Sequence, residues 1–221
     1  MTREEFDIEF DQYRNYLREE VFRFRSFVAV YRNLHERMND RIEAINLAPA
    51  FFQIVDSSLF SVIVIWADKL LDEHGQRGLF NFLVFIENNK KWLSAKELQR
   101  RRNYQDGHWV LKDRTTITFA SISAHRDQIR SLDAVQSFKI RRDKFHGHFD
   151  KAYFYDRARL DKEAPIRWND LDATCALMGE IINIYSADFD GKVYTWEPIN
   201  INDLNVLLDY AQIALLQEKN E

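Results

Sequence analysis

The stretch EEFDIEFDQYRNYLREEVFRFRSFVAVYRNLHERMNDRIEA (residues 4–44) decides the fold class of this chain. Its apolar residues recur every three or four positions, which is the period of one face of an α-helix. They are Phe6, Phe10, Tyr13, Leu17, Val21, Phe24, Val28, Tyr31, Leu34, Met38 and Ile42. A narrow stripe of this length suits packing against another long helix, in this chain or in a partner.

The composition of the whole chain favours helices. Its 221 residues include 17 Phe, 9 Tyr and 5 Trp and are 46% hydrophobic, which is enough apolar area for a core. Only 6 Gly and 3 Pro occur, too few for the tight turns of a sandwich or barrel. We therefore predict an all-α helical bundle over residues 1–221, a single domain with a long N-terminal helix and extra C-terminal helices.

Further helices follow from the apolar pattern and its breaks. One begins near Pro49 and runs to about Asp72; because it is apolar around much of its circumference, we expect it to be central. The remaining helices are expected at 79–88, after Ser94, at about 134–156, at 169–189 before Gly191, and at 202–219. We expect a loop at 103–113, whereas 115–132 fits either a strand or a helix.

The expected location is the cytoplasm, without a membrane span. Charged residues begin at Arg3, so we expect no signal peptide. Asp56 and Asp68 flank the apolar run 61–67 too closely for a membrane span. The single cysteine, Cys175, cannot form an internal disulfide, and its apolar surroundings indicate a core residue.

The charge balance limits any contact with nucleic acid to a local patch. The net charge is −4, whereas proteins that coat nucleic acid non-specifically are usually basic. One basic run is present, and the alternative is that it forms a solvated helix face. It consists of Lys139, Arg141, Arg142, Lys144, His146, His148, Lys151, Arg157 and Arg159.

Arg142 has an unusual position in the predicted helix 134–156. At about 100° per residue it projects from the apolar stripe of that helix. The stripe consists of Val135, Phe138, Phe145, Phe149 and Ala152. A guanidinium is costly to desolvate without a partner, so Arg142 either pairs with a buried acid or meets an anion in a cleft. Asp68 or Asp72 would serve as the acid; His146 and His148, on the flanks of the stripe, suit phosphate chemistry.

The segment RDKFHGHFD (residues 142–150) resembles the signature of the HEPN superfamily. That signature is an Arg, usually followed by a polar residue, with a His after four to six intervening positions. The segment is similar in particular to AbiU-type abortive-infection proteins. The matching residues are Arg142, Asp143, Lys144, Gly147, His148 and Asp150.

This resemblance implies an endoribonuclease that needs no metal and no cofactor. The ribose 2′-OH would attack the adjacent phosphate and leave a 2′,3′-cyclic phosphate and a 5′-OH. His148 would exchange protons and Arg142 would bind the phosphoryl oxygens. Asp143 would hold the Arg or the His, with Lys144, His146 and Asp150 in support. The resemblance also implies RNA as substrate, a toxin or phage-defence role, a homodimer through the motif helix, and an antitoxin or a nucleotidyltransferase as partner.

Two ambiguities accompany the motif. In a straight helix Arg142 and His146 nearly superpose, whereas His148 points about 120° away, so geometry favours His146 and the family pattern favours His148. We assign the acid–base role to His148. A second Arg–His spacing, Arg102 to His108, is set aside because Asp106-Gly107 places it in a loop.

Two alternatives to a nuclease remain. His146, His148 and Asp150 have the His-x-His-x-Asp spacing of a metal site, although no strand pattern surrounds them. HEPN domains also include inactive members, so the second alternative is a non-catalytic module that binds RNA, a nucleotide or a partner protein.

Overall fold

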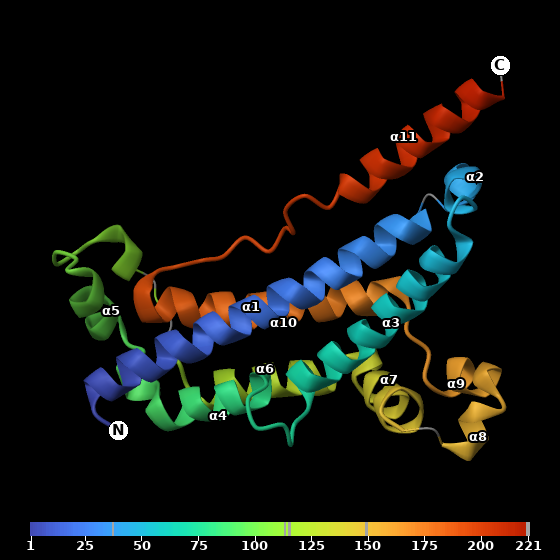
Figure 1. Cartoon of the computed structure of the whole chain (residues 1–221). Helices are drawn as coiled ribbons and strands as arrows, with labels where there is room; N and C mark the ends of the chain where they lie inside the picture. The colour runs from blue at the N-terminus through green and yellow to red at the C-terminus, as the bar shows by residue number, and fades with distance from the viewer. Residues whose placement is uncertain (37, 113, 115, 149, 220–221) are drawn as a thin grey trace.

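Three long helices lie along the bundle in the computed structural model of the chain, which describes residues 1–219 except positions 37, 113, 115 and 149 (Figure 1). They are α1 (Arg3–Glu36), α3 (Pro49–Leu71) and α10 (Trp168–Asp190). Every regular element in these described ranges is a helix, which confirms the all-α prediction.

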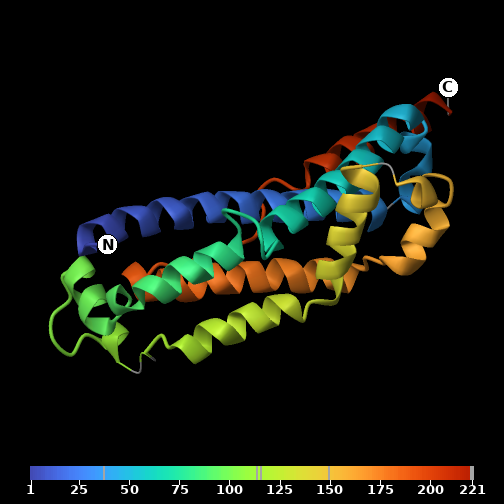
Figure 2. The same ribbon diagram turned by 90° about the horizontal axis from the view of Figure 1, so that it is seen from below.

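Shorter elements complete the chain. They are η1 (Asn39–Arg41), α2 (Ile42–Ile45), α4 (Leu79–Asn89), η2 (Lys90–Trp92), α5 (Ala95–Arg102), η3 (Trp109–Leu111), α6 (Phe119–Arg130), α7 (Asp133–Arg141), η4 (Arg142–His146), α8 (Lys151–Phe154), α9 (Arg157–Glu163) and α11 (Asp203–Glu218). In both ribbon views α7 runs across the bundle rather than along it (Figures 1 and 2).

The main core includes residues of α1, α3, α4 and α10 and is rich in aromatic rings. Phe10 stacks on Phe189 with ring centroids 4.2 Å apart, and both side chains are buried. Burying each such side chain contributes about 1.5–3 kcal/mol. The one deeply buried cation of α1, Arg14, lies 2.8 Å from Asp190. The apolar stripe predicted for residues 4–44 is the stripe that faces this core as far as Leu34.

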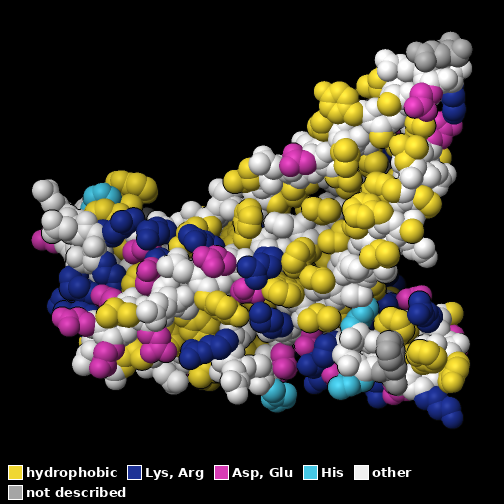
Figure 3. Space-filling model, viewed as in Figure 1, with side chains coloured by type: hydrophobic (Ala, Val, Ile, Leu, Met, Phe, Trp, Pro, Cys, Tyr) yellow, Lys and Arg dark blue, Asp and Glu magenta, His cyan; other side chains and the backbone are white. Residues whose placement is uncertain are grey.

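The N-terminal half of α3 does not fit the prediction that this helix is central. Ile63, Val64 and Ala67 are buried, but Phe51 and Ile54 are exposed. Side chains of α11 and of the start of α3 form an apolar surface near the C-terminus (Figure 3). By length and composition α3 is also apolar enough to cross a membrane, with 17% of its most apolar window buried. The C-terminal half of α3, however, packs in the core.

The predicted continuous helix 134–156 is wrong. The α-helix ends at Arg141, a π-helical turn follows over Arg142–His146, and α8 begins only at Lys151. The ambiguous segment 115–132 contains α6, whose first turn is capped by Thr118. The segment between α8 and α10 contains the short helix α9.

Candidate active site at the turn after α7

A short backbone hydrogen bond closes the C-terminal end of the π-helical turn η4. The amide of Gly147 donates a 2.7 Å hydrogen bond to the carbonyl oxygen of Arg142, an i to i+5 bond. A Cβ at position 147 would lie 2.9 Å from that oxygen, so the turn requires a glycine here. The wider turn changes the angle between successive side chains, and a wheel of 3.6 residues per turn therefore misplaces every residue after Arg142.

Arg142 forms ion pairs with two carboxylates and stays partly exposed, although its buried Nε has no hydrogen-bond partner among the described residues. Its Nη1 lies 3.2 Å from Asp68 Oδ2 on α3, and its Nε lies 2.7 Å from Asp143 Oδ1. Burial raises the pKa of Asp68, and the Arg142 charge opposes that shift. About a third of the Arg142 side chain is exposed (33%), and it lines a cavity of about 390 Å³. Arg142 thus pairs with an acid, Asp68, and its guanidinium also remains accessible from the cavity.

His146 points back into the protein. Its ring lies 6.1 Å from that of Phe60, and its buried Nε2 has no hydrogen-bond partner. Burial lowers the pKa of His146 to about 4, and the nearby Arg141 charge lowers it further in the same direction. A neutral imidazole in this position is a packing group at neutral pH. The geometric preference for His146 as the partner of Arg142 depended on a straight helix, which this turn is not.

His148 lies in the bend that follows η4, and its side chain is exposed. The bend is braced by a 3.1 Å ion pair between Lys144 Nζ and Asp150 Oδ2. Asp150 also begins α8, because its Oδ1 accepts a hydrogen bond from the amide of Ala152. That amide, and then Lys144, lower the pKa of Asp150. His148 is thus an accessible imidazole on a segment fixed at both ends.

The family model described as AbiU2 matches residues 7–209 of this sequence. The chain belongs to the HEPN AbiU2 family. A search of curated proteins and a search of solved structures each returned no match. The family match spans nearly the whole sequence, so the AbiU2 relationship rests on far more of the chain than the nine motif residues.

Some of the other basic residues around η4 are neutralised. Arg141 is buried and donates to the carbonyl oxygen of Ala164 and to Asp161 Oδ1, at 2.6 and 2.8 Å. Arg159 pairs with Glu163 at 2.8 Å. The predicted basic run is therefore not a continuous positive surface.

The second Arg–His spacing of this AbiU2 chain is structural. Arg102 ends α5 and donates from Nε to the carbonyl oxygen of Asp190. His108 stacks on Tyr104 and caps η3, with its Nδ1 accepting from the amide of Val110. Both side chains are thus occupied in positions remote from η4 along the fold.

The metal alternative has no geometric support. Within the part of the chain that the structure describes, no three His, Cys, Asp or Glu side chains are grouped so as to hold a metal ion. His146 Nε2 is buried, and Asp150 is engaged by Lys144 and by the start of α8.

Residues from outside the motif share the Arg142 cavity. Tyr16 of α1, Lys69 of α3 and Arg77 of the loop before α4 line it together with Arg142. Nothing in their sequence context indicates a chemical role, because each lies in an ordinary helical or turn pattern. The loop that carries Arg77 contains Gly75 and Gly78, which interrupt the apolar pattern between α3 and α4.

Proposed function

We propose that this chain is a metal-independent endoribonuclease that cleaves RNA next to a 2′-hydroxyl. The 2′-oxygen attacks the adjacent phosphorus, the bond from phosphorus to the 5′-oxygen breaks, and that oxygen takes up a proton. The products are a 2′,3′-cyclic phosphate and a 5′-OH. His148 exchanges the proton, because its imidazole is accessible and histidine is the side-chain type best suited to proton exchange near neutral pH. Arg142 binds the phosphoryl oxygens and offsets their developing charge.

The observation that carries this proposal is the hydrogen bond from Gly147 N–H to Arg142 C=O. It places His148 directly after a residue that is bound to the Arg142 backbone. The burial of His146 leaves His148 as the accessible imidazole of the motif. The Lys144–Asp150 pair and the contact from Asp143 to Arg142 give both candidate catalytic residues a fixed environment.

A homodimer completes the proposed chemistry, since attack by the 2′-OH needs a base and departure of the 5′-oxygen needs an acid. Two copies of His148 would supply both. Phe138 of the stripe that motivated this contact is fully buried within the chain. The contact between copies would therefore use the exposed side of the turn, around Lys144 and His148. A toxin or defence role, restrained by an antitoxin or a nucleotidyltransferase, accompanies the nuclease proposal.

The test is cleavage of labelled single-stranded RNA in excess EDTA, with identification of the new ends. Arg142→Ala should reduce the cleavage rate by about 10²–10³-fold, as the loss of a group that binds a developing charge does. Arg102→Ala is the matched control and should cleave at the wild-type rate. Loss of wild-type cleavage in EDTA, or equal rates for the two variants, would rule the proposal out.

A second candidate is a non-catalytic module, favoured by the neutralisation of Arg142. Asp68 and Asp143 together satisfy its charge without any bound anion. In that case RNA, nucleotide or a partner protein binds without reaction. RNA binding without cleavage, unchanged by Arg142→Ala, would support this candidate.

A further inference from the structure

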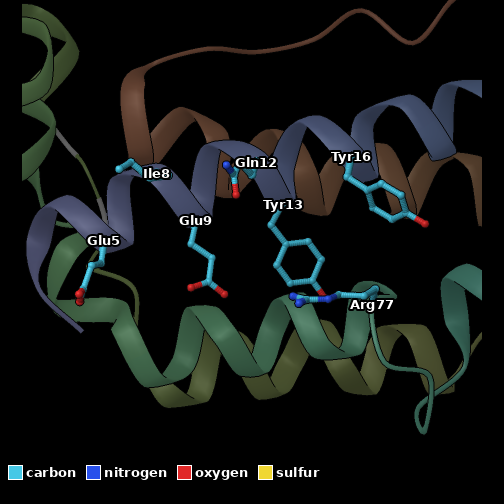
Figure 4. Close-up of a pocket in the computed structure, with 7 residues that line it drawn as sticks. All are labelled: Glu5, Ile8, Glu9, Gln12, Tyr13, Tyr16 and Arg77. Carbon is cyan, nitrogen blue, oxygen red and sulfur yellow. The ribbon is translucent and has the colours of Figure 1, made fainter.

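A continuous groove leads from Arg142 along α1. Tyr16 and Arg77 line both the 390 Å³ cavity that contains Arg142 and a neighbouring hollow of about 700 Å³. Figure 4 shows the second hollow, in which side chains of α1 and Arg77 face each other. Both volumes lie in the range of small-ligand sites, about 300–1,000 Å³.

Arg77 is an exposed guanidinium that no carboxylate neutralises among the described residues. Its nearest defined contact is the ring of Tyr13, whose centroid lies 5.7 Å away. The two other cations of the cavity are engaged: Lys69 donates to Glu20 at 3.2 Å, and Arg142 pairs with Asp68. Arg77 is thus the cation of the groove that is free to bind an anion.

The backbone that carries Arg77 is held in place by Gly78. The hydroxyl of Tyr13 donates to the carbonyl oxygen of Gly78 at 3.1 Å. A Cβ at position 78 would lie 2.8 Å from the carbonyl oxygen of Leu70, so α3 and this loop approach as closely as a glycine allows. Arg77 therefore projects from a fixed position between α1 and α3.

Tyr16 supplies an aromatic surface beside this cation. Its side chain is 41% exposed, and the Lys69 ammonium lies 5.9 Å from its ring centroid. Exposed aromatic rings stack on unpaired bases, and neighbouring Arg or Lys side chains bind the phosphates. Farther along the groove, Glu5 and Glu9 would repel a continuing phosphate backbone.

We propose that this groove is a nucleotide subsite of the ribonuclease, in which Arg77 binds the phosphate next to the cleaved one and Tyr16 stacks on its base. The inference rests on the proposed function, because the cleaved phosphate is placed at Arg142. The acidic far end limits the site to a short single-stranded element. This agrees with the overall charge of −4, which does not favour binding to long nucleic acid.

Binding and cleavage are measured separately. The binding probe is a fluorescent single-stranded RNA pool with every ribose 2′-O-methylated, which blocks the attacking oxygen. Tyr16→Ala should weaken binding about five- to hundred-fold, and Tyr16→Phe should retain it. Arg77→Ala should reduce the slope of log affinity against log salt by about 0.7, as for one lost phosphate contact. Arg18→Ala, an exposed arginine of α1 outside this groove, is the control and should bind like wild type.

The outcomes separate the two proposals. If the wild type cleaves RNA, and Arg77→Ala and Tyr16→Ala cleave it with a raised KM and an unchanged kcat, both proposals are supported. If the wild type cleaves RNA, and both variants bind and cleave RNA as Arg18→Ala does, the subsite proposal is overturned and the nuclease proposal is retained. Binding that depends on Arg77 and Tyr16 without cleavage supports the subsite and overturns the nuclease. Tyr16→Phe keeps the aromatic ring. If it melts normally and still binds RNA, a loss of binding in Tyr16→Ala is assigned to the missing ring.

Discussion

The amide of Gly147 lies 2.7 Å from the carbonyl oxygen of Arg142, and this bond converts the end of α7 into a π-helical turn. The turn has two consequences for the motif. It directs His146 into the protein, against Phe60, and it leaves His148 in an accessible bend. The spacing between the motif Arg and His is therefore meaningful only together with the small residue that precedes the His.

Gly147→Ala should disrupt the motif geometry. The added methyl carbon would lie 2.9 Å from the Arg142 carbonyl oxygen, and the backbone must move to relieve this contact. A displacement of about 1 Å can lower cleavage by about 10²-fold, which initial-rate measurements would detect. Gly107→Ala is the control: its positive φ of 79° also strains an alanine, but no atom lies within 4 Å. It should lower the melting temperature and spare cleavage; equal cleavage by both variants would contradict the account.

The burial of His146 should make stability depend on pH. Its pKa is lowered to about 4 in the folded protein, whereas the unfolded chain takes up the proton near pH 6.5. The neutral imidazole therefore contributes full stability above about pH 6.5, and this contribution is lost as the pH falls toward 4. His146→Leu removes the titration. Urea unfolding should show wild type losing more stability than this variant between pH 7 and pH 5, and parallel losses would show that His146 is not buried.

Asp68 should compete with substrate for Arg142. Its Oδ2 lies 3.2 Å from Arg142 Nη1, so its negative charge offsets the positive charge that would attract a phosphoryl oxygen. Asp68→Asn should lower KM for RNA severalfold and cost about 1–3 kcal/mol of stability, because Arg142 loses the charge of its ion-pair partner, a buried carboxylate. Asp72→Asn, in the same cavity without an ion pair to Arg142, should leave KM unchanged. A higher KM in Asp68→Asn would indicate that Asp68 positions Arg142 for the reaction.

Much of the fold follows from local patterns that tertiary contacts do not override. The apolar stripe from Phe6 to Leu34 predicts α1, and Pro49 marks the start of α3. Gly191 ends α10 with a φ of 77°, as expected for a glycine after a helix. Ser94 accepts a hydrogen bond from the amide of Glu97 at the start of α5. The pairing of Arg142 with Asp68 was one of two predicted alternatives, since a buried cation requires an acid.

Other features depend on contacts between distant segments. The π-helical turn at Arg142 is not visible in a periodicity that assumes 3.6 residues per turn. The burial of His146 depends on Phe60 of α3, and its lowered pKa depends also on Arg141. The exposure of the first half of α3 depends on which helices cover it, which its apolar composition cannot specify. Tyr16 and Arg77 meet only because α1 packs beside the loop before α4.

The most direct test of the central claim compares His148→Ala with His146→Leu in single-turnover cleavage of labelled RNA in excess EDTA. His148→Ala should lose about 10²–10⁴-fold in rate with an unchanged melting curve, because an exposed acid–base group is removed. His146→Leu should cleave at a rate close to that of wild type, with 2′,3′-cyclic phosphate and 5′-OH ends. Cleavage that survives in His148→Ala and disappears in a folded His146→Leu would contradict the account.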